Sequence, residues 1–115
     1  MLSKYKKNFE KQVMGYLSYL PDFKNFQNLA DEMKLYNTEN NQFDVLTYTN
    51  KNGNCLGIVG IQLTSHFVII RYLSLAPSYR TEEVIQEIMT ELNNLYPNQK
   101  ISTLPNWTML LKYTE

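Results

Sequence analysis

The pattern of apolar and polar positions is clearest from Val68 to Leu95. Its first part, V-I-I-R-Y-L-S-L, is almost continuously apolar, which predicts an inner strand buried on both faces. A loop containing Pro77 leads to a helix predicted over Glu82–Leu95. The apolar face of that helix consists of Val84, Ile85, Ile88, Met89, Leu92 and Leu95. Because the first amides of a helix have no intrahelical partners, a strand that leads into a helix start predicts a binding site made of backbone.

The N-terminal third of the chain combines one short strand with two stretches of helical spacing. Leu2 to Lys6 predicts the strand, and a helix is predicted from Asn8, as its N-cap, until Pro21 ends the pattern. The apolar positions of this helix are Phe9, Val13, Met14, Leu17 and Leu20. Those of a second helix are Phe23, Phe26, Leu29, Ala30, Met33 and Tyr36. Two such helices joined by a Pro-Asp turn predict a helical hairpin that lies on an apolar surface.

The middle of the chain has the spacing of a sheet. Strands are predicted from Gln42 to Thr49, from Cys55 to Leu63 and from Phe67 to Leu75. Asn50 to Asn54 contains an Asn-Gly pair that favours a tight turn, and Thr64 to His66 forms a second short turn. These strands should therefore form an antiparallel meander. The second strand contains two glycines, Gly57 and Gly60, which indicate a bulge or a close backbone approach.

The C-terminal part predicts a crossover. Pro97 and Asn98 end the helix over Glu82–Leu95, and Lys100 to Leu104 resumes as a strand. Strand, helix and strand in this order place the last strand parallel to the strand that ends at Leu75. A short helix is predicted from Trp107 to Tyr113, with Trp107 as its core anchor.

Composition narrows the class of protein. The 115 residues predict a single domain over 1–115, and 11 basic residues balance 11 acidic ones, so no bulk attraction to nucleic acid or to an anionic membrane is expected. One cysteine, Cys55, and one histidine, His66, argue against a disulfide framework and a zinc site. The chain shows no secretory pattern and no apolar stretch long enough to cross a bilayer. We therefore expect a cytoplasmic protein without a metal.

The order of predicted elements, with L-S-L-A-P-S-Y-R opening a helix, resembles the GNAT superfamily of acetyl-CoA-dependent N-acetyltransferases. More narrowly, Y-K-K-N-F-E-K-Q-V-M-G-Y-L-S-Y-L-P and I-R-Y-L-S-L-A-P-S-Y-R are similar to the RibT-like proteins, a family of small proteins from riboflavin operons. The resemblance covers nearly the whole chain. It implies an α/β (α+β) fold: a GNAT-like mixed sheet of about five strands with a helical hairpin, a crossover helix and a short C-terminal helix.

The resemblance also implies a site for acetyl-CoA or CoA. In the superfamily, the pantetheine arm lies between the fourth strand and its parallel neighbour and pairs with backbone that here is Leu73, Ser74 and Leu75. The diphosphate lies on a loop of pattern Gln/Arg-x-x-Gly-x-Gly/Ala at the start of the next helix. Here that loop is Arg80, Thr81, Glu82, Glu83, Val84 and Ile85. Arg80 matches the first position, whereas Glu83 and Ile85 replace the two small residues.

This departure leaves two interpretations of the loop. A glutamate adds bulk, and its carboxylate competes for the amides that would hold the diphosphate. One like-charge contact would cost on the order of 1 kcal/mol, roughly fivefold in affinity. Thr81 as an N-cap followed by two glutamates is also how a helix start is stabilised without a ligand. The loop is either a weakened coenzyme site or a self-capped helix.

The catalytic positions are mixed. In the superfamily, a tyrosine on the last helix, about two turns after an asparagine, can protonate the leaving thiolate, and Asn106 and Tyr113 keep this relation. A tyrosine near a C-terminus is also commonly a packing residue. The strand offers no glutamate as a general base, and Arg71 is its ionisable residue before Tyr72.

Two functions therefore remain open. The first is acetyl transfer from acetyl-CoA to a small-molecule or peptide amine, with a link to riboflavin metabolism implied by the resemblance. The second is a non-catalytic GNAT-fold binding or interaction module. Larger members of the superfamily continue with two strands that wall the acceptor pocket. The resemblance therefore implies that the acceptor site here is either shallow or completed by a second subunit, as in a homodimer.

Overall fold

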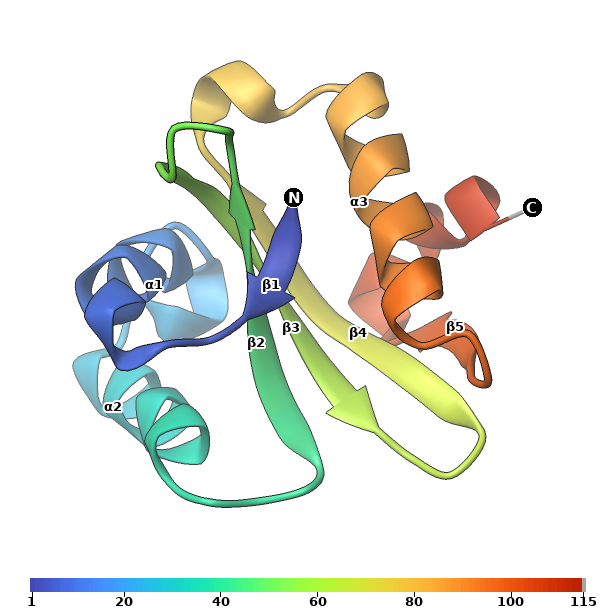
Figure 1. The fold of residues 1–115 in the computed structure, drawn as a ribbon. Helices are drawn as coiled ribbons and strands as arrows, with labels where there is room; N and C mark the ends of the chain where they lie inside the picture. The colour runs from blue at the N-terminus through green and yellow to red at the C-terminus, as the bar shows by residue number, and fades with distance from the viewer. Residues whose placement is uncertain (115) are drawn as a thin grey trace.

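The computed structural model describes residues 1–114, in which five strands form one mixed sheet in the order β1-β2-β3-β4-β5 (Figure 1). The strands are β1 (Leu2–Lys4), β2 (Phe43–Thr49), β3 (Cys55–Leu63), β4 (Phe67–Leu75) and β5 (Lys100–Thr103). Consecutive strands from β1 to β4 pair antiparallel, and β5 pairs parallel with β4. The predicted meander and the predicted parallel crossover are both confirmed.

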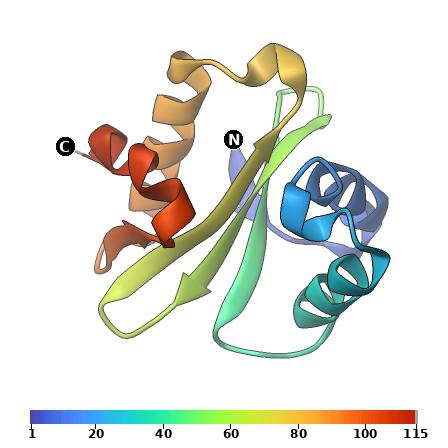
Figure 2. The same ribbon diagram turned by 180° about the vertical axis from the view of Figure 1, so that it is seen from behind.

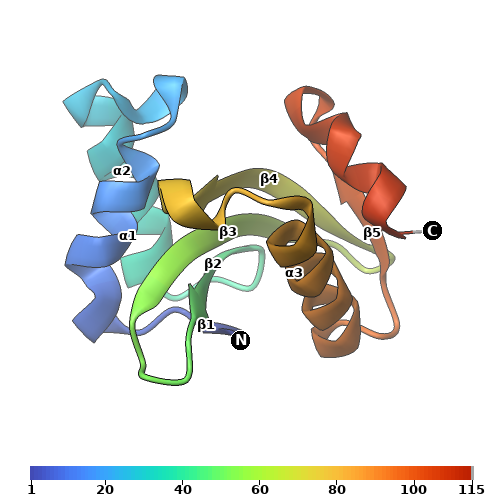
Figure 3. The same cartoon turned by 90° about the horizontal axis from the view of Figure 1, so that it is seen from above.

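The helices form a layer on each side of the sheet (Figure 3). Within the described residues, α1 (Glu10–Leu17) and α2 (Phe26–Asn37) cover one face, and α3 (Glu82–Leu95) covers the other. Four 3₁₀ segments connect or extend these elements: Lys7–Phe9 (η1), Pro21–Phe23 (η2), Pro77–Tyr79 (η3) and Pro105–Thr114 (η4). The mixed sheet, the helical hairpin and the crossover helix of the predicted fold are confirmed.

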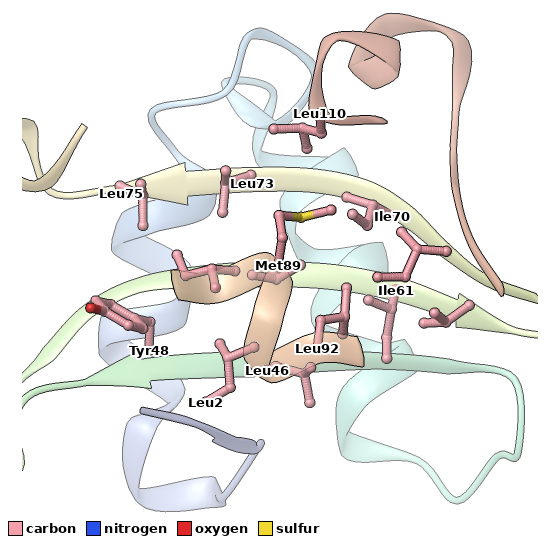
Figure 4. Close-up of a cluster of buried hydrophobic side chains, with 14 residues drawn as sticks. Leu2, Leu46, Tyr48, Ile61, Ile70, Leu73, Leu75, Met89, Leu92 and Leu110 are labelled. Carbon is pink, nitrogen blue, oxygen red and sulfur yellow. The ribbon is translucent and has the colours of Figure 1, made fainter. Parts of the chain in front are cut away.

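Each face of the sheet has its own apolar core. On the α3 side, Met89 and Leu92 lie over Leu46, Ile61 and Ile70 of the sheet (Figure 4). On the hairpin side, a second cluster of buried residues joins α1 and α2 to the strands, and it consists of Val13, Leu17, Met33, Val45, Ile58 and Tyr72. Trp107 is partly buried and packs against both clusters, which agrees with its predicted role as an anchor for the last segment.

Several predicted helix boundaries are wrong. Asn8 is not the N-cap of the first helix, because residues Lys7–Phe9 form a 3₁₀ turn and α1 begins only at Glu10. The second helix begins at Phe26 rather than near Phe23, because Pro21–Phe23 forms a 3₁₀ turn. Its N-cap is Asn25, whose side chain accepts hydrogen bonds from two backbone amides of the first turn. Phe26 and Leu95 are 76% and 45% exposed, because each lies at the end of its helix rather than on the face that meets the sheet.

The two ends of the chain also differ from the prediction. The first strand ends at Lys4 rather than Lys6, and β5 ends at Thr103. The predicted short C-terminal helix is found as a 3₁₀ segment over Pro105–Thr114, and its backbone is not helical at Trp107. The Trp107 ring at this kink is partly buried and packs against both cores.

Glycines occupy a turn and a close contact where a side chain would not fit. Gly53 has φ +82°, and the Asn50 side chain accepts hydrogen bonds within the same turn. The pairing of β3 with β4 shifts register directly after Gly60. A Cβ at Gly60 would lie 2.2 Å from ring atoms of Tyr72, so the ring occupies the space that any side chain would need. The predicted bulge is found at Gly60, and the predicted close backbone approach at Gly57, where a Cβ would lie 2.7 Å from the Ser74 carbonyl oxygen.

Candidate functional site

The defining feature of the candidate site is that β4 is longer than β5. The two strands pair from Phe67 to Ile70, and the Leu104 amide donates the last hydrogen bond, of 2.9 Å, to the Ile70 carbonyl. Beyond this point β4 continues to Leu75 with only β3 beside it. The Ala76 amide donates to Leu56 on the β3 side, so the alternation of a strand directs the main-chain groups of Leu75 and Leu73 to the opposite edge. That edge has no strand partner.

A groove of about 270 Å³ follows this open edge and is called the splay groove here. It is lined by Tyr19, Leu20, Leu73, Ser74, Leu75, Arg80 and Ile85. Arg80 is held in this lining by two contacts: its Nε donates a 2.9 Å hydrogen bond to the Leu75 carbonyl, and its guanidinium lies 5.5 Å from the Tyr19 ring centroid. Three of the predicted coenzyme residues on β4 and two from the following loop therefore line the same groove.

The start of α3 is only partly capped by its own side chains. Thr81 is the N-cap, as predicted, and its hydroxyl accepts a 3.2 Å hydrogen bond from the Val84 amide. The amides of Glu82 and Glu83 have no acceptor among residues 1–114. Glu82 extends toward Lys112, with 3.6 Å between carboxylate and ammonium. The helix start thus keeps unpaired donors, which is the condition for binding an anion.

The two residues that depart from the family pattern occupy different environments. Ile85 lines the splay groove and packs against the core on the α3 side. Glu83 is exposed and does not line the groove. The bulk of Ile85 therefore narrows the groove, whereas the carboxylate of Glu83 lies outside its lining.

A second hollow adjoins the splay groove and is lined by residues of η2, β4 and η4. The ribbon of Figure 2 shows the helical hairpin and η4 on opposite sides of β4. This aromatic hollow has a volume of about 350 Å³ and shares Leu20 with the splay groove. It is lined by Leu20, Pro21, Asp22, Phe23, Arg71, Tyr72, Leu104, Asn106 and Trp107. The structure therefore places Asn106 in this hollow rather than at the start of α3.

Tyr113 lies elsewhere. It lines a hollow of about 310 Å³ between α3 and β5, together with Gln86 and Lys100 among others. Its backbone carbonyl accepts a 3.1 Å hydrogen bond from Gln86, and the Lys112 ammonium lies 5.1 Å from its ring centroid. The ring is partly buried against the core on the α3 side. Asn106 and Tyr113 thus line separate hollows, and neither is among the residues that line the splay groove.

A buried ionic network beneath the aromatic hollow escaped the sequence prediction. Arg71 on β4 makes a bidentate ion pair with Glu32 on α2, with N–O distances of 2.5 and 3.0 Å. The Tyr36 hydroxyl donates to Glu32 and lies 2.5 Å from the Tyr72 hydroxyl. Glu32 is 6% exposed. The signal for this pair was present in the sequence, because an arginine inside an apolar strand requires a carboxylate partner.

The network also shifts the titration of its members. Burial raises the pKa of both Tyr36 and Tyr72, and the Glu32 charge raises the pKa of Tyr36 further. Burial alone would lower the pKa of Arg71, but the hydrogen bonds and the charge of Glu32 outweigh it and raise that pKa. Both tyrosines therefore stay neutral and the arginine stays charged over the whole physiological range. The network therefore connects α2 to β4 with the same charges at every physiological pH.

The other chemically reactive residues lie outside these hollows. His66 is exposed in the turn before β4, as predicted. Cys55 is half-buried at the start of β3, and burial raises the pKa of its thiol, which disfavours the nucleophilic thiolate. Among residues 1–114, His, Cys, Asp and Glu side chains form no group that could hold a metal ion. In the same part of the chain, no helix is long and apolar enough to cross a membrane.

Comparisons with known proteins agree with this geometry. No family model matches the chain. Over 107 residues it is 31% identical to an uncharacterized N-acetyltransferase of Bacillus methanolicus, with 92% of this chain and 86% of that protein covered.

Solved structures show the same fold at low sequence identity. The aminoglycoside N-acetyltransferase AAC(6')-Iy in complex with CoA has a TM-score of 0.71 at 14% identity, over 97% of this chain and 82% of that chain. A spermidine N-acetyltransferase SpeG chimera from Vibrio cholerae and hSSAT has a TM-score of 0.68 at 12% identity, over 97% and 78%. From its relative of 31% identity and its fold, this protein belongs to the GNAT-type N-acetyltransferase family.

Proposed function

We propose that this protein transfers an acetyl group from acetyl-CoA to the amino group of an acceptor. The observation that carries this proposal is the open edge of β4, which continues past the end of β5 and leads to the partly capped start of α3. An extended amide-bearing chain such as pantetheine can pair with such an edge as an additional strand would. The main-chain groups of Leu73 and the amide of Leu75 would hold it, because the Leu75 carbonyl already accepts a hydrogen bond from Arg80.

The diphosphate end of the coenzyme fits the helix start. The unpaired amides of Glu82 and Glu83 and the helix dipole favour an anion there. Arg80 uses Nε for the Leu75 carbonyl, and its remaining guanidinium N–H groups have no acceptor among residues 1–114. Thr81, Val84 and Ile85 shape the turn between these groups. The bound coenzyme would supply an activated thioester to the amine.

Isothermal titration of the folded protein with CoA and acetyl-CoA tests the coenzyme site. We expect saturable binding with a dissociation constant on the order of micromolar. Arg80→Ala should weaken binding about fivefold or more, because it removes a charge from a partly solvated anion site. Glu83→Gln should tighten it modestly, and Glu82→Gln is the matched control, since that carboxylate is turned toward Lys112. Affinity that is unchanged in Arg80→Ala would move the coenzyme site elsewhere.

A second function is favoured by one feature of the splay groove. Ile85 stands where the family pattern has a small residue, and its side chain lines the groove. A groove narrowed in this way suits a descendant of the fold that binds a partner without turnover. Absence of CoA binding at millimolar ligand by the folded protein would favour this function, and Ile85→Ala should then restore measurable affinity.

The proposal for the catalytic acid is Tyr113, with Asn106 preceding it on the same segment. The spacing of the two residues on η4 supports this role. Their positions in separate hollows argue against it, because the acid must reach the thiolate of the coenzyme. Tyr113→Phe keeps the packing of the ring and removes the hydroxyl. If Tyr113 is the acid, this change lowers the rate of CoA release without altering coenzyme affinity; an unchanged rate assigns the ring to packing alone.

We also propose the narrower RibT-like assignment and its link to riboflavin metabolism. Its support is the N-terminal sequence similarity, in the segment that leads from η1 through α1 to Leu20 and Pro21, two residues of the aromatic hollow. Mass spectrometry of reactions with acetyl-CoA and amine intermediates of riboflavin synthesis tests it. Acetylation of unrelated amines, with none of these intermediates modified, would contradict the link.

A further inference from the structure

The aromatic hollow carries one uncompensated negative charge at its edge. Asp22 lines it and forms no ion pair among residues 1–114. The other charged residue of its lining, Arg71, is neutralised by the bidentate contact with Glu32. A ligand entering this hollow therefore meets a carboxylate and no available cation.

The walls of the hollow are aromatic faces and edges. The rings of Phe23 and Tyr72 meet at 73°, with centroids 5.7 Å apart, and Trp107 lines the hollow as well. One of these rings already contacts a cation, because the Arg71 guanidinium carbon lies 5.9 Å from the Tyr72 centroid. Aromatic walls beside one carboxylate are the combination that binds an ammonium group attached to an apolar body.

The neighbouring charges argue for one cation rather than several. A hollow on the other side of Asp22 and Phe23 is lined by the acidic residues Asp31 and Glu32 as well. Asp31 accepts a hydrogen bond from Gln27, and Glu32 is committed to Arg71. Within the aromatic hollow itself, Asp22 is thus the carboxylate left for a ligand. Its volume of about 350 Å³ is near the lower end of small-molecule sites, about 300–1,000 Å³.

We propose that the aromatic hollow is the acceptor site and that it selects a compact amine with a single positive charge on an aromatic or apolar body. Asp22 attracts the ammonium group, and Phe23, Tyr72 and Trp107 hold the body. The site adjoins the splay groove through Leu20, so a ligand there lies next to the open edge of β4. As an acceptor site this rests on the proposed acetyl transfer, whereas recognition of the amine does not require it.

Ligand binding to the full chain tests the selection. The probes are phenethylamine, its uncharged analogue 2-phenylethanol, and spermidine as a polycation, each titrated by NMR with and without saturating CoA. Phenethylamine should bind more tightly than the alcohol, by up to about fivefold, since contact with a solvent-exposed carboxylate is worth at most about 1 kcal/mol. It should also bind more tightly than spermidine.

Two matched variants locate the charge. Asp22→Asn should remove most of the preference for phenethylamine over 2-phenylethanol, whereas Asp31→Asn, which lines only the neighbouring hollow, should leave it unchanged. Equal binding of amine and alcohol, a stronger response to spermidine, an equal effect of both variants, or no binding of phenethylamine would each overturn the proposal. The CoA titration tests the proposed function separately. If the protein binds phenethylamine in an Asp22-dependent way but does not bind CoA, acetyl transfer is wrong and amine recognition stands.

Discussion

Removing one partner of the ion pair between Glu32 and Arg71 should strongly destabilise this fold, because it leaves a buried charge without its counter-charge. Replacing Glu32 by Gln keeps the shape of the side chain but leaves the Arg71 guanidinium, whose side chain is 17% exposed, without its counter-charge. Breaking a buried ion pair from one side costs about 3–5 kcal/mol. Because Arg71 keeps some contact with water, we expect about 3 kcal/mol, a large share of the roughly 5–15 kcal/mol that stabilises a domain.

Urea unfolding followed by circular dichroism measures this loss. Asp31→Asn is the control, since it removes the adjacent carboxylate on α2 and should change stability by no more than about 0.5 kcal/mol. The double variant Glu32→Leu with Arg71→Met should recover most of the loss, because an apolar pair avoids the desolvation cost of two buried charges. The loss should also be nearly independent of salt. A loss below about 1 kcal/mol in Glu32→Gln, or a double variant as unstable as the sum of the single ones, would refute this reasoning.

Two glycine substitutions and one tyrosine substitution test other parts of the fold. Gly60→Ala should lower the free energy of unfolding, measured by urea unfolding, by about 1–3 kcal/mol, because the new Cβ would lie 2.2 Å from the Tyr72 ring. Gly15→Ala, in α1 with nothing within 4 Å of the new Cβ, should instead stabilise by about 1 kcal/mol. Burial and then the hydrogen bond to Glu87 raise the pKa of Tyr48 from 10.0 to about 12, so its contribution to stability is complete below pH 10 and is lost as pH rises through about 12. Alkaline unfolding should therefore be less steep in Tyr48→Phe, and an unchanged profile would remove Tyr48 as its cause.

Local signals explain which parts of the fold were predictable. The bounds of β3, β4 and α3 were predicted correctly, because an Asn-Gly turn, Pro77 and the Thr81 cap mark their ends within a few residues of sequence. The start of the first helix was predicted wrongly at Asn8, because a 3₁₀ turn and an α-helix share the same apolar spacing over one turn.

The sequence by itself determined most of the elements and their order, since hydrophobic periodicity and turn residues act over short distances. The likeness to a GNAT fold came from the resemblance of its motifs to that superfamily. Only the tertiary structure decided where the chemistry lies. Glu32 and Arg71 meet although they are 39 residues apart, and the length difference between β4 and β5 opens the splay groove. Asn106 and Tyr113, equally prominent in the sequence, line separate hollows because η4 passes from the end of β5, beside β4, to the side of α3. Such contacts depend on how whole elements pack, and no short stretch of sequence encodes them.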